Sequence, residues 1–164
     1  MILIILLISF FLDGFLLSTI NSNSLFFPLC SLMAMIIIYP FFKKSDYNKF
    51  LIVSGIMGMF YDLVYMNTLL LNIGLFLLMA VIIKIVFFFY SNNLISNLLI
   101  GSLLVCLYRV ITYLVLVLGN YLNFSFLELL KGIYSTLLLN VIYIIVFYCV
   151  TLTISKKYKI PRDN

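Results

Sequence analysis

Long apolar runs separated by short polar segments make up most of the chain, and they predict its secondary structure. An α-helix needs about 20 residues to cross the hydrocarbon core of a membrane. Six apolar runs approach or reach that length, at residues 2–20, 25–42, 50–66, 69–90, 94–118 and 132–154. We therefore expect an all-α membrane protein, with a single transmembrane domain of six helices over residues 1–164 and a basic tail at 155–164.

The polar segments between the runs differ in charge, and this difference predicts the orientation. The connection at 43–49 and the tail at 155–164 hold most of the lysines and arginines, whereas the turns at 21–24 and 67–68 hold none. Short segments rich in Lys and Arg stay on the cytoplasmic side of a membrane. With six crossings, both termini are expected in the cytoplasm. Lys84 is expected to reach the same face, and the tail is expected to contact anionic membrane lipids.

The composition agrees with this membrane assignment. The chain is 66% hydrophobic and 9% charged, whereas soluble domains are roughly 45–50% apolar and about 25% charged. Its mean hydropathy is +1.28. Six helices leave no room for a soluble domain in 164 residues. The net charge of +5 is therefore interpreted as a topology signal, and no nucleic-acid binding is expected.

The residue types argue against catalysis. The chain contains no histidine, which removes the commonest general base and metal ligand. Cys30, Cys106 and Cys149 are scattered through apolar runs and fit neither a disulfide framework nor a metal site. A serine–histidine pair and an HExxH helix are excluded, and Asp13 and Asp62 lack a motif that would make them a catalytic dyad. We expect no catalytic residue, no cofactor and no metal ion.

The run from Gly55 to Gly74 is apolar but carries one carboxylate. Gly55, Gly58 and Asp62 are spaced i, i+3 and i+7, so a helix would bring them to one face. Glycine allows a neighbouring helix to approach closely, and a buried acid needs such a neighbour to pair with it. The run breaks at 66–68. It therefore predicts two membrane helices joined by a very short turn.

Three charged residues lie inside the predicted spans at similar depths. At about 1.5 Å per residue, Asp13, Asp62 and Arg109 lie roughly 16, 18 and 22 Å from the cytoplasmic ends of their spans. A charge facing lipid at mid-membrane costs about 2.5–3.5 kcal/mol. We therefore expect Arg109 to pair with Asp62, Asp13 or both inside the bundle. Asn140 lies on a polar stripe of the last span. These side chains would fix helix packing, line a ligand or ion pathway, or contact a partner.

Four features of the sequence occur together: the G-x-x-G-x-x-x-D-L run at 55–63, Tyr65, Asn72 and the FLDG sequence at 11–14. In these features the chain resembles the MreD family, small membrane proteins of the bacterial cell-elongation machinery. The chain length and the layout of six spans are also similar. The resemblance implies a fold like that of the S subunits of energy-coupling-factor transporters. It implies a non-enzymatic scaffold in the bacterial cytoplasmic membrane. The partners it implies are an MreC-like bitopic membrane protein, the MreB filament and the peptidoglycan synthases of the elongation complex.

The alternative function is that of an S-type subunit that binds a small vitamin for an energy-coupling-factor transporter. Such a site needs several convergent polar or aromatic side chains and a long outer loop as a lid. The outer turns at 21–24 and 67–68 are short, and only 119–131 is long enough to close a pocket. The scaffold is therefore favoured. The residues expected to form a buried charge network or a partner face are Asp13, Asp62, Arg109, Gly55, Gly58 and Asn140.

Overall fold

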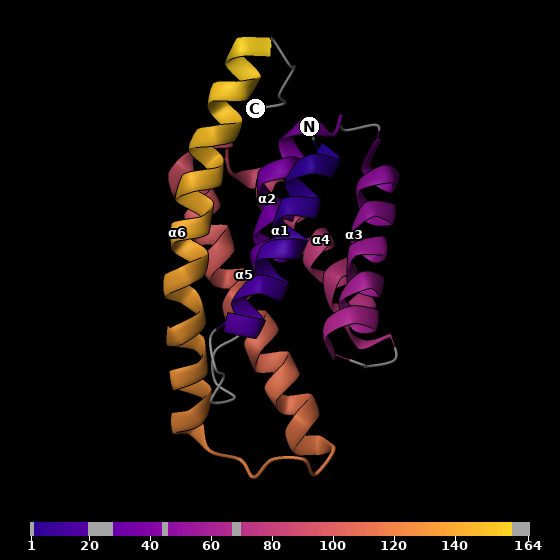
Figure 1. The fold of residues 1–164 in the computed structure, drawn as a ribbon, viewed down its shortest axis with the longest axis vertical. Helices are drawn as coiled ribbons and strands as arrows, with labels where there is room; N and C mark the ends of the chain where they lie inside the picture. The colour runs from indigo at the N-terminus through magenta and orange to yellow at the C-terminus, as the bar shows by residue number, and fades with distance from the viewer. Residues whose placement is uncertain (1, 20–27, 44–45, 67–69, 159–164) are drawn as a thin grey trace.

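The computed structural model describes residues 2–19, 28–43, 46–66 and 70–158, and their regular elements are all helical (Figure 1). In chain order the elements are α1 (Ile2–Thr19), α2 (Cys30–Ile38), the 3-10 helix η1 (Tyr39–Phe41), α3 (Tyr47–Tyr61), the π-helical η3 (Asp62–Met66), α4 (Leu71–Phe89), α5 (Leu94–Leu118) and α6 (Phe126–Tyr158). The expected all-α class is confirmed for this part of the chain.

Four helices, α1, α4, α5 and α6, are long and apolar enough to cross a membrane. Helices α2 and α3 are shorter, with 9 and 15 residues. By length and composition, four helices of the described residues are therefore candidate membrane spans, where the sequence predicts six. The predicted turns at 21–24 and 67–68 lie outside the described residues.

Helix α2 lies at the centre of the bundle. All 9 of its residues are buried, and it packs against α1, α4, α5 and α6. Its sequence, CSLMAMIII, is apolar on every side, which is typical of a helix enclosed by other helices. The enclosing helices direct large apolar side chains outward, such as Phe11, Phe15 and Phe88, which are 70%, 63% and 82% exposed. A surface this apolar suits contact with lipid.

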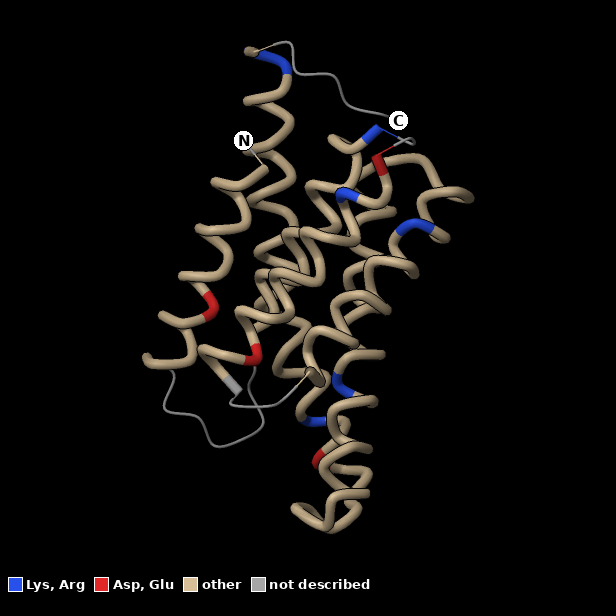
Figure 2. Tube along the Cα trace, turned by 90° about the vertical axis from the view of Figure 1, so that its right-hand side faces the viewer, with Lys and Arg blue, Asp and Glu red and all other residues tan. Residues whose placement is uncertain are grey.

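The helices alternate in direction along the bundle. Helix α1 begins and α6 ends at the same end of the molecule (Figure 1). Helix α3 packs mainly against α4, and α5 packs mainly against α6. Figure 2 shows Lys and Arg positions concentrated toward the end of the bundle at which α1 begins. We call this the basic end.

Helix α6 extends beyond the predicted span 132–154 in both directions. It begins at Phe126, within the predicted loop 119–131, and ends at Tyr158, within the predicted tail. Glu128 lies in its first turn, and Lys156 and Lys157 lie in its last turn. These charges have the signs that stabilise the two ends of a helix dipole. The helix therefore continues where the apolar run stops.

Candidate functional site

Asp13, on α1, caps the start of α2. Its side chain is 0% exposed. Oδ1 accepts a hydrogen bond from the Cys30 backbone N–H at 2.7 Å, and Oδ2 accepts one from the Ser31 N–H at 2.9 Å. The Ser31 hydroxyl donates a third hydrogen bond to Oδ2 at 2.6 Å. The carboxylate of one helix thus binds the first backbone N–H groups of the next.

Asp62, at the junction of α3 and η3, caps the start of α4 in a similar way. Its side chain is 4% exposed. The Asn72 backbone N–H donates to both carboxylate oxygens at 3.1 Å, and the Ile73 N–H donates to Oδ2 at 3.2 Å. The Asn72 side-chain amide donates to Oδ1 at 2.9 Å. The chain enters α4 through Leu70, whose φ of 67° lies in the left-handed region.

These two caps solve the same physical problem. The first N–H groups of any α-helix have no partner within the helix, and leaving such groups unpaired in an apolar environment is costly. A carboxylate accepts their hydrogen bonds, and its charge is favoured by the helix dipole. Each hydrogen bond to a charged group contributes about 1.5–3 kcal/mol. Through these hydrogen bonds, Asp13 links α1 to α2, and Asp62 links α3 to α4.

Tyrosine hydroxyls connect the two helix pairs. Tyr61 donates to the Pro28 carbonyl at 3.0 Å, and Tyr65 donates to the Phe10 carbonyl at 2.5 Å. A Cβ built on Gly14 would lie 2.8 Å from the Tyr65 hydroxyl. The absence of a side chain at Gly14 therefore leaves the space in which Tyr65 reaches α1.

The network at Asp62 continues into α5. Asn72, which donates to Asp62, accepts a hydrogen bond from the Tyr108 hydroxyl at 2.7 Å through its own side-chain oxygen. Asn72 and Tyr108 are 0% and 1% exposed. One buried chain of hydrogen bonds thus joins α3, α4 and α5.

Arg109 on α5 forms a separate polar contact with Thr136 on α6, and Asn140 lies one turn further along α6. The Arg109 guanidinium donates from Nε and Nη2 to the Thr136 hydroxyl at 2.9 and 2.6 Å. The Asn140 amide donates to the Thr136 carbonyl at 2.8 Å, and among the described residues its Oδ1 has no hydrogen-bond partner. The expected pairing of Arg109 with Asp13 or Asp62 stays a prediction. It would be contradicted by an Asp62→Arg, Arg109→Asp double variant no more stable than either single variant.

The two glycines of the α3 motif differ in how closely α4 approaches. A Cβ on Gly58 would lie 2.6 Å from the Asn72 carbonyl oxygen and 2.7 Å from the Ile73 Cα. A Cβ on Gly55 would lie 3.6 Å from Leu77 Cδ2, which is ordinary contact. The close approach predicted from the glycine pattern is confirmed at Gly58. At Gly55 a side chain would fit.

Sequence reasoning did not predict that Asp13 and Asp62 accept hydrogen bonds from the backbone N–H groups at the starts of α2 and α4. It also missed Tyr61, Tyr108 and Ser31, since a tyrosine or serine in an apolar run carries no sign of its partner. Within the described residues, no three His, Cys, Asp or Glu side chains come together as a possible metal site. Comparison with known proteins found no match to this chain among family models, curated proteins or solved structures.

Proposed function

We propose that the chain crosses the membrane six times, with α2 and α3 as the two short crossings. Helix α2 and η1 together cover Cys30–Phe41, about 18 Å at 1.5 Å per residue, against a hydrocarbon core of about 30 Å. A helix this short is tolerated because other helices, and not lipid, surround it. The start of α1 and the end of α6 lie at the same end of the bundle (Figure 1), which supports an even number of crossings. The basic residues near that end support cytoplasmic termini (Figure 2).

We further propose that the protein is a non-enzymatic scaffold of the bacterial cell-elongation complex in the cytoplasmic membrane. The observation that carries this proposal is that the residues behind the MreD resemblance contact one another. Gly58 and Asp62 both meet the start of α4 at Asn72. Tyr65 packs against Gly14, which belongs to the FLDG sequence of α1. Residues that match a family motif and also contact one another support common ancestry more strongly than scattered matches do.

On this proposal the polar interior fixes the helices, and the outer surfaces bind partners. Asp13 and Asp62 are occupied by helix starts, so they hold the bundle in one arrangement. An MreC-like bitopic protein would pack its single helix against an apolar outer face within the membrane. The basic end would face the MreB filament, and the peptidoglycan synthases would join through the same complex.

Co-purification tests the proposal. The tagged full chain is expressed in a bacterium that has an elongation complex, extracted in mild detergent and captured, alongside an unrelated six-span protein with the same tag. We expect an MreC-like protein to co-purify with this chain and not with the control. Recovery of only a transporter ATPase and its membrane coupling subunit would contradict the scaffold and favour the vitamin-binding alternative.

A further inference from the structure

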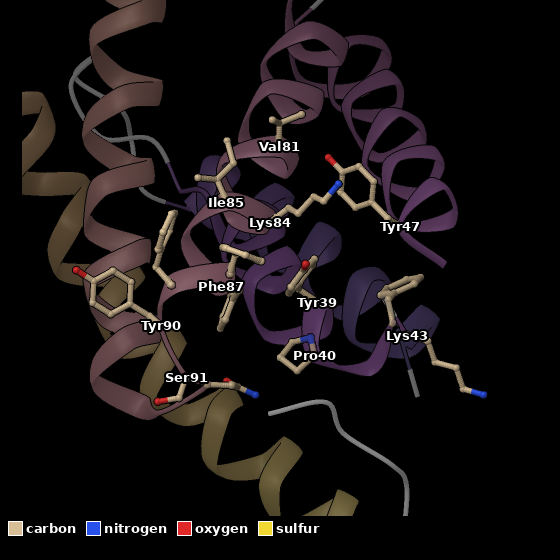
Figure 3. A pocket seen from close by; sticks show the side chains of 14 residues that line it. Tyr39, Pro40, Lys43, Tyr47, Val81, Lys84, Ile85, Phe87, Tyr90 and Ser91 are labelled. Carbon is tan, nitrogen blue, oxygen red and sulfur yellow. The ribbon is translucent and has the colours of Figure 1, made fainter. Parts of the chain in front are cut away.

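A cavity of about 720 Å³ opens at the basic end, between the end of α4, η1 and the start of α3 (Figure 3). Helix α4 has 19 residues, about 28 Å at 1.5 Å per residue, which matches the hydrocarbon thickness of a membrane. The cavity beside its last turns therefore lies where lipid headgroups meet the hydrocarbon core. This location follows from α4 alone and does not depend on the proposed scaffold function.

The part of the cavity wall that α4 forms carries one lysine and a row of apolar side chains. Val81, Lys84, Ile85 and Phe88 line the cavity and are spaced i, i+3, i+4 and i+7, so they share one face of the helix. The three apolar side chains are 42%, 52% and 82% exposed. This apolar stripe runs from Phe88, next to the end of α4 at the headgroup level, to Val81, toward the middle of the membrane. Lys84 lies between them, and its long side chain can reach the headgroups.

Aromatic side chains pack against one another beside the cavity. Tyr39 stacks on Phe87 at 5.2 Å between ring centroids and meets Phe50 edge-on at 5.0 Å. The Lys84 side chain reaches toward Tyr47 in Figure 3, and its Nζ lies 3.7 Å from the ring centroid. This cation–π contact holds the ammonium group at the cavity.

Charge around the opening favours an anion. Lys43 lies at the rim and extends outward in Figure 3. The nearby carboxylate of Asp46 is paired with Lys49 at 3.0 Å. The residues that line the cavity include Lys43 and Lys84 but no Asp or Glu.

We propose that this cavity binds one anionic phospholipid of the surrounding membrane. The phosphate lies at Lys84 and Lys43, near the end of α4, and an acyl chain lies along Ile85 and Val81, toward the middle of the membrane. A phospholipid has both the charge and the hydrocarbon that these two parts of the wall require. An acidic peptide would satisfy the lysines, but it would have to bring unpaired backbone groups into the apolar part of the cavity.

Native mass spectrometry of the purified full chain in detergent tests the proposal. Phosphatidylglycerol and phosphatidylcholine with identical acyl chains are titrated separately, and glycerol 3-phosphate is added as a competitor. We expect phosphatidylglycerol to bind at least about fivefold more tightly, because one basic residue contributes about 1 kcal/mol toward an anionic lipid. Equal binding of the two lipids, or displacement by glycerol 3-phosphate at equal concentration, would overturn the proposal.

Two variants and a control locate the site. Lys84→Gln should weaken phosphatidylglycerol binding about fivefold, and Ile85→Trp should weaken both lipids by filling the apolar stripe. Lys157→Gln removes the same charge from the end of α6, outside the cavity, and should leave binding unchanged. Circular dichroism and gel filtration establish that each variant is folded. Equal losses for Lys84→Gln and Lys157→Gln, no loss for Ile85→Trp, or binding of a soluble acidic peptide that Lys84→Gln abolishes would overturn the proposal.

Discussion

Asp62 Oδ1 accepts hydrogen bonds from both the backbone N–H and the side-chain amide of Asn72, at 3.1 and 2.9 Å. A single residue at the start of α4 thus supplies two donors to one buried carboxylate oxygen. The Asn72 amide is in turn fixed by the Tyr108 hydroxyl at 2.7 Å. Asp62 thus binds the start of α4 directly and is connected to α5 through Asn72.

Asp62→Asn should destabilise the protein strongly. The asparagine side chain has no negative charge and replaces one acceptor oxygen by an N–H₂ group, so hydrogen bonds donated by Asn72 and Ile73 are lost. We expect a loss of about 2–4 kcal/mol, measured by thermal unfolding in detergent. Asp46→Asn is the matched control, since Asp46 forms an exposed pair with Lys49 worth about 0–1 kcal/mol. Equal losses for the two variants would contradict the capping role of Asp62.

Asp13 and Ser31 should be energetically coupled. The Ser31 hydroxyl donates to Asp13 Oδ2 at 2.6 Å in a buried site. A double-mutant cycle with Asp13→Asn and Ser31→Ala should give a coupling free energy of about 1.5–3 kcal/mol. The comparison cycle uses Ser102→Ala, because the Ser102 hydroxyl donates to the Leu99 carbonyl instead. A coupling near zero between Asp13 and Ser31 would be inconsistent with the cap on α2.

Gly58→Ala and Gly55→Ala should have different effects although both occur in one helix. A Cβ at position 58 would meet the backbone of Asn72 and Ile73, so α3 and α4 would have to move apart at a cost of about 1–3 kcal/mol. A Cβ at position 55 meets only the end of the Leu77 side chain, and alanine is up to about 1 kcal/mol better than glycine in a helix. Thermal unfolding of both variants distinguishes these outcomes, and a neutral Gly58→Ala would show that the close approach is absent.

The Thr136 hydroxyl should be required for the α5–α6 contact. Thr136→Val leaves the Arg109 Nε and Nη2 donors without their acceptor, and we expect a loss of about 1.5–3 kcal/mol. Thr136→Ser keeps the hydroxyl and should retain most of the stability. Thermal unfolding in detergent measures both, and identical behaviour of the valine and serine variants would rule out this role.

The extent to which the sequence predicts this structure depends on the kind of interaction. The all-α class follows from the apolar runs, and the close approach at Gly58 follows from a glycine on the same helix face as an acid. The caps on α2 and α4 could not be predicted in this way. Sequence reasoning seeks an opposite charge for Asp13 and Asp62, and that pairing stays a prediction. The donors seen at both acids include backbone N–H groups, which every residue except proline carries and which no sequence pattern marks. Similarly, α6 continues through the charged residues Glu128, Lys156 and Lys157, which interrupt an apolar run but do not end a helix.

The most direct test of the central claim, a six-crossing bundle with both ends in the cytoplasm, is a pair of reporter fusions. Green fluorescent protein or alkaline phosphatase is fused after residue 164 and, in a truncated chain, after Asn120, between α5 and α6. We predict fluorescence without phosphatase activity at residue 164, and phosphatase activity without fluorescence at Asn120. Phosphatase activity at residue 164 would show an odd number of crossings or an inverted orientation, and would contradict the account.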